Sequence, residues 1–160
     1  MKKFIALFLI ISATASAQLK VTTGDADLDN SLIALNKDAK NALEAFKNDA
    51  IEKFNTTKSI VENLLNIHKM EPSDVLMTLE IAQITTKPVE TVATSFDKNK
   101  SKGWGEIAKE MGIKPGSKEF HALKNDAKGK SKGMKGKGNG NSNSNGNGNG
   151  NGKGKGKGKK

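Results

Sequence analysis

The chain has 160 residues, carries a formal net charge of +10 and contains no cysteine. The missing cysteines exclude disulfides, a thiolate nucleophile and a cysteine-ligated zinc site. All basic side chains are lysines apart from two histidines, so the bidentate fork with which arginine reads guanine or clamps phosphate is absent.

The charge is distributed unevenly along the sequence. Residues 1–17 contribute +2 from two lysines, and residues 18–126 hold 15 lysines and all 17 acidic residues. Residues 127–160 hold ten lysines and no acid. Any attraction to polyanions is therefore expected from the C-terminal segment and not from the preceding domain.

Residues 1–17 have the three parts of a secretory signal peptide. Two lysines precede an apolar run over 4–11, and small residues follow up to Ala17, which fits the A-x-A cleavage rule with Gln18 as the first mature residue. A transmembrane anchor is the alternative, but the uncharged stretch 4–19 falls short of the about 20 apolar residues that a spanning helix needs. We expect export to the periplasm, the cell surface or the medium, with no transmembrane segment in the mature protein.

The mature sequence begins with apolar residues at helical spacing. From Leu28 to Phe54 they recur in steps of three and four, which predicts one amphipathic helix over 28–54. Thr56 or Thr57 can cap a second, short helix. Its expected apolar positions are Ile60, Val61, Leu64 and Leu65.

Two prolines mark the next two helices. Pro72 and Pro88 each suit the first turn of a helix and are followed by apolar residues at helical spacing. The polar run 98–102 is expected to form a loop.

The last two predicted helices flank a turn. One covers about 104–111 and ends at Gly112, and the other is capped by Ser117 and presents Phe120 and Leu123. Trp104 and Phe120 are the expected anchors of this corner in the core.

Taken together, the elements predict an all-α bundle of five to six short-to-medium helices forming one domain over 18–126. Residues 127–160 are almost entirely Gly, Lys, Asn and Ser, so they are expected to form a disordered polycationic tail. The expected polyanion-binding residues are its lysines: Lys128, Lys130, Lys132, Lys135, Lys137, Lys153, Lys155, Lys157, Lys159 and Lys160.

The segment Gly103-Trp-Gly-Glu-Ile-Ala-Lys-Glu-Met-Gly-Ile113 has some features of a helix-turn-helix. The buried positions expected in the second helix fall on Lys118 and His121, which places Phe120 and Leu123 out of register. We therefore interpret the segment as a structural corner and expect no specific reading of DNA.

The stretch Lys102-Gly-Trp-Gly-Glu-Ile-Ala-Lys-Glu-Met-Gly-Ile-Lys-Pro-Gly-Ser-Lys-Glu-Phe-His-Ala-Leu-Lys124 resembles the C-terminal signature of a family of small exported bacterial helical proteins. The segment 70–80 is similar to theirs as well. The resemblance covers roughly 28–124 and implies a folded helical domain that ends near Lys124. It implies no activity.

Metal binding and catalysis find little support in the sequence. Asp25, Asp27 and Asp29 imitate the start of a calcium loop, but the glycine and glutamate that an EF-hand requires are missing. His68 and His121 lack a metal-ligand spacing. No nucleophile, paired-histidine or other catalytic pattern is present, so we expect neither an enzyme nor a cofactor.

The functional hypothesis is a secreted, non-enzymatic binding or structural protein whose tail holds polyanions such as lipopolysaccharide, acidic polysaccharide or extracellular DNA. The alternative is a periplasmic or extracellular regulator, for example an inhibitor, whose tail serves only solubility. The sequence leaves the ligand of the helical domain and its oligomeric state open.

Overall fold

The structure, a computed structural model, describes residues 22–134. The predicted signal peptide and residues 135–160 of the predicted tail lie outside the described residues. The described part contains α-helices and one short 3-10 helix but no strand, which confirms the all-α prediction. The elements are α1 (Ala26–Asn41), α2 (Leu43–Phe54), α3 (Lys58–Asn66), α4 (Pro72–Thr85), α5 (Val89–Asn99), η1 (Lys100–Lys102), α6 (Trp104–Glu110) and α7 (Lys118–Gly133).

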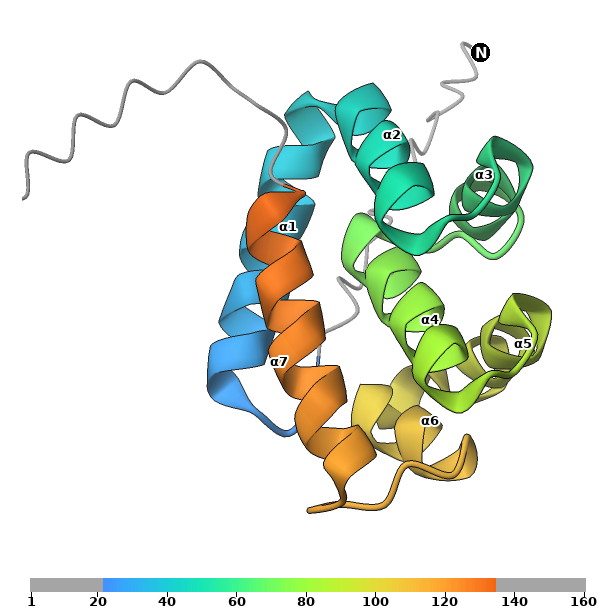
Figure 1. The fold of residues 1–160 in the computed structure, drawn as a ribbon. Coiled ribbons are helices and arrows are strands. Elements are labelled where there is room, and N and C mark those ends of the chain that lie inside the picture. The colour runs from blue at the N-terminus through green and yellow to red at the C-terminus, as the bar shows by residue number, and fades with distance from the viewer. Residues whose placement is uncertain (1–21, 135–160) are drawn as a thin grey trace, which may run out of the picture.

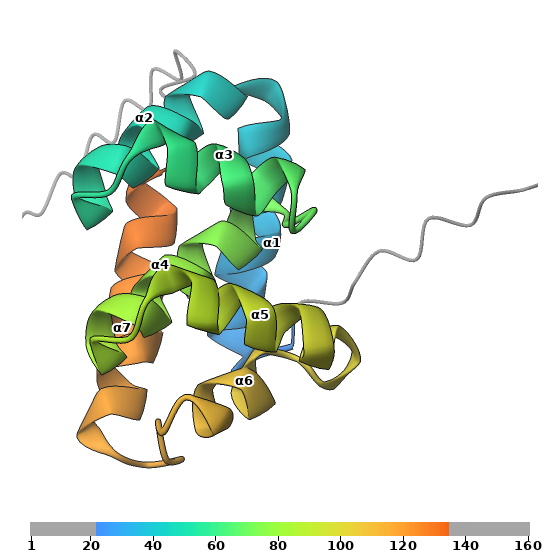
Figure 2. The same ribbon diagram turned by 90° about the vertical axis from the view of Figure 1, so that its right-hand side faces the viewer.

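Helix α4 is the centre of the fold. It lies between α1 and α7 on one side and α3 and α5 on the other, as Figure 1 and the turned view in Figure 2 show. Every residue from Pro72 to Ala82 is buried, so this helix has no solvent-facing stripe. The polar side chains between Pro72 and Ala82 are buried as well and need hydrogen-bond partners.

The hydrophobic core surrounds α4 and draws on all the other α-helices. Helix α1 contributes a stripe at the predicted spacing, and α6 contributes the buried Trp104 and Ile107. The buried residues of the stripe in α1 are Leu28, Leu32, Leu35 and Ala39.

The predicted helix over 28–54 is wrong in one respect, because the chain breaks at Ala42 into α1 and α2. Ala42 has a non-helical backbone (φ −145°, ψ 47°), and Leu43 beyond it is 41% exposed. A straight helix over 28–54 would be about 40 Å long. This is too long to fit within a domain whose radius of gyration is about 13 Å. The break lets α2 pack against α3 and α4, and it raises the number of described α-helices to seven, against the expected five to six.

The predicted end of the domain at Asp126 is also wrong. Helix α7 continues to Gly133, and Ala127, Ser131 and Met134 are buried. These residues continue the helical spacing set by Phe120 and Leu123, and α7 packs along α1 and α4. The folded domain therefore extends at least to Met134.

Several helix starts agree with the sequence expectations. Thr57 and Ser117 each cap a helix, as expected, by accepting the backbone N–H of Ile60 and of Phe120 respectively. Asp25, for which no cap is predicted, caps α1 in the same way by accepting the backbone N–H of Leu28. Pro72 occupies the first turn of α4, and Pro88 immediately precedes α5. Within residues 22–134, no helix combines the length and hydropathy needed to cross a membrane.

Candidate functional site

Only Lys128, Lys130 and Lys132 of the predicted polyanion-binding lysines lie within the described residues, and all three belong to α7. The expectation that they sit in a disordered tail is therefore corrected. The other seven lie outside the described residues: Lys135, Lys137, Lys153, Lys155, Lys157, Lys159 and Lys160.

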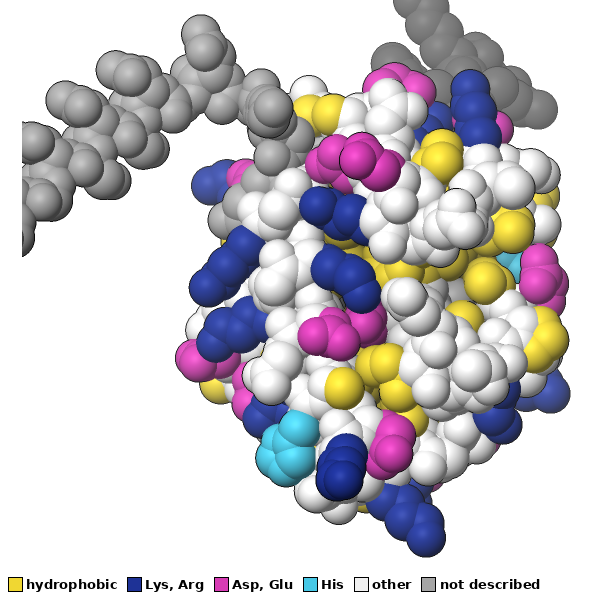
Figure 3. Space-filling view, in the orientation of Figure 1, with side chains coloured by type: hydrophobic (Ala, Val, Ile, Leu, Met, Phe, Trp, Pro, Cys, Tyr) yellow, Lys and Arg dark blue, Asp and Glu magenta, His cyan; other side chains and the backbone are white. Residues whose placement is uncertain are grey.

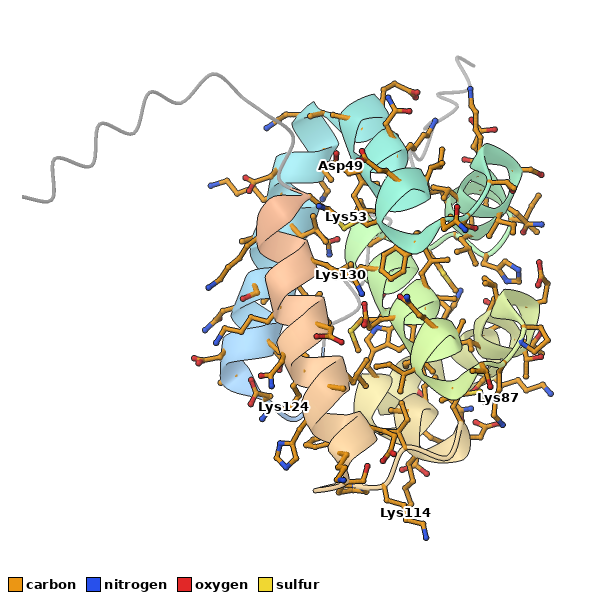
Figure 4. The ribbon with its side chains drawn as sticks, viewed as in Figure 1. Asp49, Lys53, Lys87, Lys114, Lys124 and Lys130 are labelled. Carbon is orange, nitrogen blue, oxygen red and sulfur yellow. The ribbon has the colours of Figure 1, made fainter. Side chains whose placement is uncertain are left out.

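Lys130 crosses from α7 to α4 and α2. Its Nζ donates to Glu80 Oε2 at 2.8 Å and to Gln83 Oε1 at 3.4 Å, and it lies 4.8 Å from the ring centre of Phe54. Figure 3 shows hydrophobic side chains gathered in the hollow between these helices, with basic side chains at its edge. Figure 4 shows Lys130 reaching into this region from α7. Lys130 therefore works inside the domain as an ion-pair partner and not as a free cation.

The Glu80 side chain in this pair is 1% exposed. Burial raises the pKa of Glu80 above its ordinary value, and the hydrogen bond and charge of Lys130 offset this effect only in part. A carboxylate at this depth would be costly without Lys130. The pair therefore depends on the part of α7 that follows Asp126.

Two further lysines of α7 connect this helix to the start of α1. Lys124 contacts Asp25 at 2.5 Å, and Lys128 contacts Asp27 at 2.9 Å. The hydrogen bond from Lys124 is the main cause that lowers the pKa of Asp25. Lys132 is exposed. Of the three predicted polyanion-binding lysines in α7, Lys128 and Lys130 are thus committed to contacts within the domain.

The revised boundary changes the charge balance of the chain. Residues 22–134 contain 17 lysines and 17 acidic residues, so the formal charge of the described domain is zero. Residues 135–160 contain seven lysines and no acid. The segregation of charge predicted from the sequence is retained with the new boundary.

Trp104 is a buried anchor as predicted, but it fixes the junction of α5 and α6 and not the predicted corner between α6 and α7. Its ring is 3% exposed and stacks on Phe96 at a centroid distance of 5.2 Å and an interplanar angle of 24°. Its Nε1–H donates to Asp74 Oδ1 at 2.9 Å. The indole therefore joins α6 to both α5 and α4.

Asp74 is the second buried carboxyl of α4. Its Oδ2 accepts the backbone N–H of Glu71 at 3.1 Å as one half of a capping box. Burial raises the pKa of Asp74, although the hydrogen bonds from Trp104 and from the Glu71 backbone act in the opposite direction. Asp74 thus fixes the start of the central helix to the Trp104 corner.

Phe120, the other predicted anchor, has a lesser role. It is only partly buried at the edge of the core, and the Nζ of Lys124 lies 5.6 Å from the centre of its ring. Leu123, Ala127 and Met134 make the buried contacts of this helix instead.

The three aspartates near the start of α1 are used within the fold. Asp25 caps the helix, Asp27 pairs with Lys128, and Asp29 Oδ1 accepts hydrogen bonds from both the backbone N–H and the hydroxyl of Thr23. Among residues 22–134, no group of three or more potential metal-ligating side chains is found.

His68 forms a surface contact between the start of the α3–α4 loop and α5. Its Nδ1 lies 2.7 Å from Asp97 Oδ2, and Lys100 Nζ lies 3.3 Å from the other carboxylate oxygen. Burial acts to raise the pKa of Asp97, but the hydrogen bonds from His68 and Lys100 outweigh it and lower the pKa. His121 is exposed at the start of α7, far along the chain from His68.

Sequence reasoning missed the internal roles of Asp74, Glu80 and Lys130. The sequence does carry a signal for the two carboxyls, because they are the only ionisable residues of α4. Their partners come from α6 and α7, which are distant in the sequence, so only the tertiary structure identifies them.

A scan against protein-family models, a search of curated proteins and a search of solved structures each gave no match for this chain.

Proposed function

We propose that this chain is an exported, non-enzymatic protein that carries a neutral helical domain and holds polyanions through the lysines that follow Met134. The proposed ligands share one chemistry: repeated phosphate or carboxylate groups, as in lipopolysaccharide, acidic polysaccharide or extracellular DNA. The attraction is electrostatic, and it does not require a base-reading or cofactor-binding site.

The separation of charge carries this proposal. The described domain has equal numbers of basic and acidic residues, whereas residues 135–160 have seven lysines and no acid. Lys128 and Lys130 already pair with Asp27 and Glu80, so the working cations are assigned to the segment after Met134. Seven phosphate contacts would give a slope of about −6 in a plot of log K against log salt.

The buried ionisable groups of the domain support a structural role for it. Asp74 accepts a hydrogen bond from Trp104 and Glu80 pairs with Lys130. Each of these carboxyls joins α4 to another helix, and their raised pKa values follow from burial. Stabilisation of the fold therefore accounts for both groups without a catalytic role.

The test compares three full mature chains from Gln18 to Lys160. The first is unchanged, and the second replaces the seven lysines after Met134 with glutamine. The third replaces seven exposed lysines of the domain with glutamine and has the same net charge as the second: Lys37, Lys40, Lys87, Lys98, Lys102, Lys114 and Lys118. Each is titrated against duplex DNA and lipopolysaccharide at about 50 and 200 mM salt.

We expect the unchanged chain to bind both ligands and to lose affinity by on the order of 10³-fold between the two salt concentrations. The variant without the seven tail lysines should lose binding, while the domain variant should retain most of it. Equal losses in the two variants would indicate a response to net charge alone and would contradict the proposed site. Absence of binding by the unchanged chain would leave the tail with a role in solubility.

A further inference from the structure

The asparagines of the chain fall into two groups that differ in the residue that follows them. Residues 22–134 contain nine asparagines, and none of them precedes a glycine. Residues 135–160 contain seven asparagines and also seven lysines. Two of these seven asparagines precede a serine and the other five precede a glycine: Asn139, Asn145, Asn147, Asn149 and Asn151. All Asn-Gly pairs of the chain therefore lie in residues 139–152, which we call the Asn-Gly segment.

An asparagine that precedes a glycine can react with its own backbone. The backbone nitrogen of the glycine attacks the side-chain amide carbon, a new carbon–nitrogen bond forms, and ammonia leaves with the proton of the glycine N–H. Water then opens the resulting five-membered imide ring and produces aspartate or isoaspartate. Glycine favours the first step because it has no Cβ to hinder the attack and restricts its backbone least. The conversion needs no enzyme and no reactant other than water.

The helical domain holds its own asparagines in a conformation that opposes this reaction. Eight of the nine lie in α-helices, and Asn55 is the C-cap of α2. Inside a helix, the N–H of the following residue is bonded to a carbonyl group of the preceding turn, so the attacking nitrogen cannot turn toward the side chain. Asn125 in α7 is held in this way, although it is the domain asparagine nearest to the Asn-Gly segment in the sequence.

The asparagines at the ends of α2 and α3 are followed by bonded N–H groups as well. The N–H after Asn55 donates to the carbonyl oxygen of Ile51 at 3.1 Å. The N–H after Asn66 donates to the carbonyl oxygen of Asn63 at 2.8 Å. In both places the attacking nitrogen is already fixed by a hydrogen bond.

The ends of α1 and α5 are fixed in two different ways. The N–H after Asn41 donates to the carbonyl oxygen of Ala39 at 3.2 Å. Asn99 is buried, and its Nδ2 donates to the carbonyl oxygen of Ser95 at 3.1 Å and to Oε2 of Glu110 at 2.6 Å. Here the leaving group itself is held, so the fold opposes the reaction at this position too.

Conversion of the Asn-Gly segment would change the charge of the chain. Each event replaces a neutral amide with a carboxyl group that is ionised at neutral pH. Conversion of the five asparagines that precede glycine lowers the formal charge of residues 135–160 from +7 to +2, and conversion of all seven lowers it to zero. Because the described domain has a formal charge of zero, residues 22–160 would then carry no net charge.

We propose that the Asn-Gly segment is a self-modification site whose loss of ammonia limits how long the chain holds a polyanion. The inference rests on the proposed function, in which the seven lysines after Met134 bind repeated phosphate or carboxylate groups. The new carboxylates lie between Lys137 and Lys153 in the sequence, so they compete with the ligand for the lysines on both sides. The released ammonia makes the change irreversible.

The first experiment measures the modification in the chain 18–160 without a polyanion. The chain is aged at neutral pH, denatured and cleaved after lysine, and mass spectrometry detects the replacement of –NH2 by –OH relative to the fresh chain. Cleavage after Lys137 and Lys153 releases one peptide, 138–153, that contains all seven asparagines. Cleavage after Lys124 and Lys128 releases a peptide that contains Asn125.

We expect conversion per asparagine to be at least about tenfold faster in the peptide 138–153 than at Asn125, because only the former contains glycine at the following position. Equal rates at the two places would overturn the proposal, since the modification would then not be selective for the Asn-Gly segment.

The second experiment measures binding of fresh and aged chains to duplex DNA and lipopolysaccharide at about 50 mM salt. The control variant replaces the seven asparagines after Met134 with glutamine, which keeps a neutral amide but has to close a six-membered ring and therefore reacts more slowly. A third variant replaces the same seven asparagines with aspartate. It reproduces the fully converted charge without ageing.

We expect the fresh chain and the glutamine variant to bind alike. Ageing should weaken binding of the unchanged chain by about 10²-fold or more because electrostatic attraction supplies the affinity, and the aged glutamine variant should keep its affinity. The aspartate variant should bind weakly from the start.

An equal loss of affinity in the aged glutamine variant would overturn the proposal, because ageing alone would then be the cause. Full binding by an aged chain whose peptide 138–153 has converted would overturn it as well. Absence of binding by the fresh chain would contradict the proposed function and this inference together. The conversion rate is measured without a polyanion, so its failure is distinguishable from failure of the proposed function.

Discussion

Helix α4 buries two carboxyl groups, and the two ends of the helix satisfy them in different ways. Asp74 lies in the first turn, where it accepts the backbone N–H of Glu71 and the indole N–H of Trp104. Glu80 lies in the helix interior and pairs with the ammonium group of Lys130 from α7. Burial raises the pKa of both groups.

The difference follows from the geometry of a helix. The first turn has free backbone N–H groups and the positive end of the helix dipole, so a carboxylate there can be stabilised by neutral donors. In the interior the backbone N–H groups are already bonded, so Glu80 requires a donor from elsewhere. That donor is Lys130, which lies beyond the predicted domain end at Asp126.

The largest expected effect comes from removing the cation at the Glu80 end. Lys130→Met leaves a buried carboxylate without its partner, which should lower the free energy of unfolding by about 3 kcal/mol. The measurement is urea denaturation followed by circular dichroism at pH 7. Lys132→Met, an exposed position on the same helix, should change stability by less than about 0.5 kcal/mol.

The pH dependence of the Lys130→Met variant tests the cause of this loss. Because burial raises the pKa of Glu80 in the folded state, the folded protein holds this proton more tightly than the unfolded chain. The contribution of Glu80 to stability is thus complete below the unfolded value of 4.5 and is lost as the pH rises through the folded pKa. The deficit of Lys130→Met should therefore shrink toward pH 4, and a deficit independent of pH would contradict the ion-pair explanation.

A smaller effect is expected at the Asp74 end. Trp104→Phe removes the indole donor, leaves Oδ1 of Asp74 without this hydrogen bond and reduces the stack on Phe96. The free energy of unfolding should fall by about 2 kcal/mol. Phe120→Leu, at a half-buried aromatic position, should cost less in the same urea titration. If the two variants cost the same, the hydrogen bond to Asp74 contributes no measurable stability.

The smallest expected effect tests the revised boundary itself. Gly129 is in α7 beyond Asp126, and a Cβ there meets no atom within 4 Å. Because glycine destabilises a helix interior relative to alanine, Gly129→Ala should stabilise the domain by about 0.5–1 kcal/mol. Thermal denaturation would detect the shift, and an unchanged midpoint would contradict a helix that continues past residue 126.

The sequence predicted the helix starts well because their signals are local. Thr57 and Ser117 accept hydrogen bonds from residues three positions away, and Pro72 fixes its own backbone angle. The break at Ala42 carries neither glycine nor proline. It follows from the need to fit α2 against α3 and α4, so no local pattern marks it.

The candidate site residues also divide into those predicted from the sequence and those that depend on contacts between distant parts of the chain. Trp104 is the predicted core anchor of the segment 103–113, and the structure confirms that its side chain is buried. The close approach of Gly103 to Thr22 and the partners of Asp74 and Glu80 are not predicted from the sequence, since each joins residues at least 30 positions apart.

The sequence by itself determined the all-α class, most helix boundaries and the separation of a lysine-rich C-terminal segment from a nearly neutral domain. Composition, helical spacing and capping residues are local signals, because each depends only on residues that are close together in the sequence. The tertiary structure decided where the domain ends and which lysines belong to it. A buried carboxyl at Glu80 needs a cation that the fold brings from α7, and only the packing of α4 against α7 determines that this cation is Lys130.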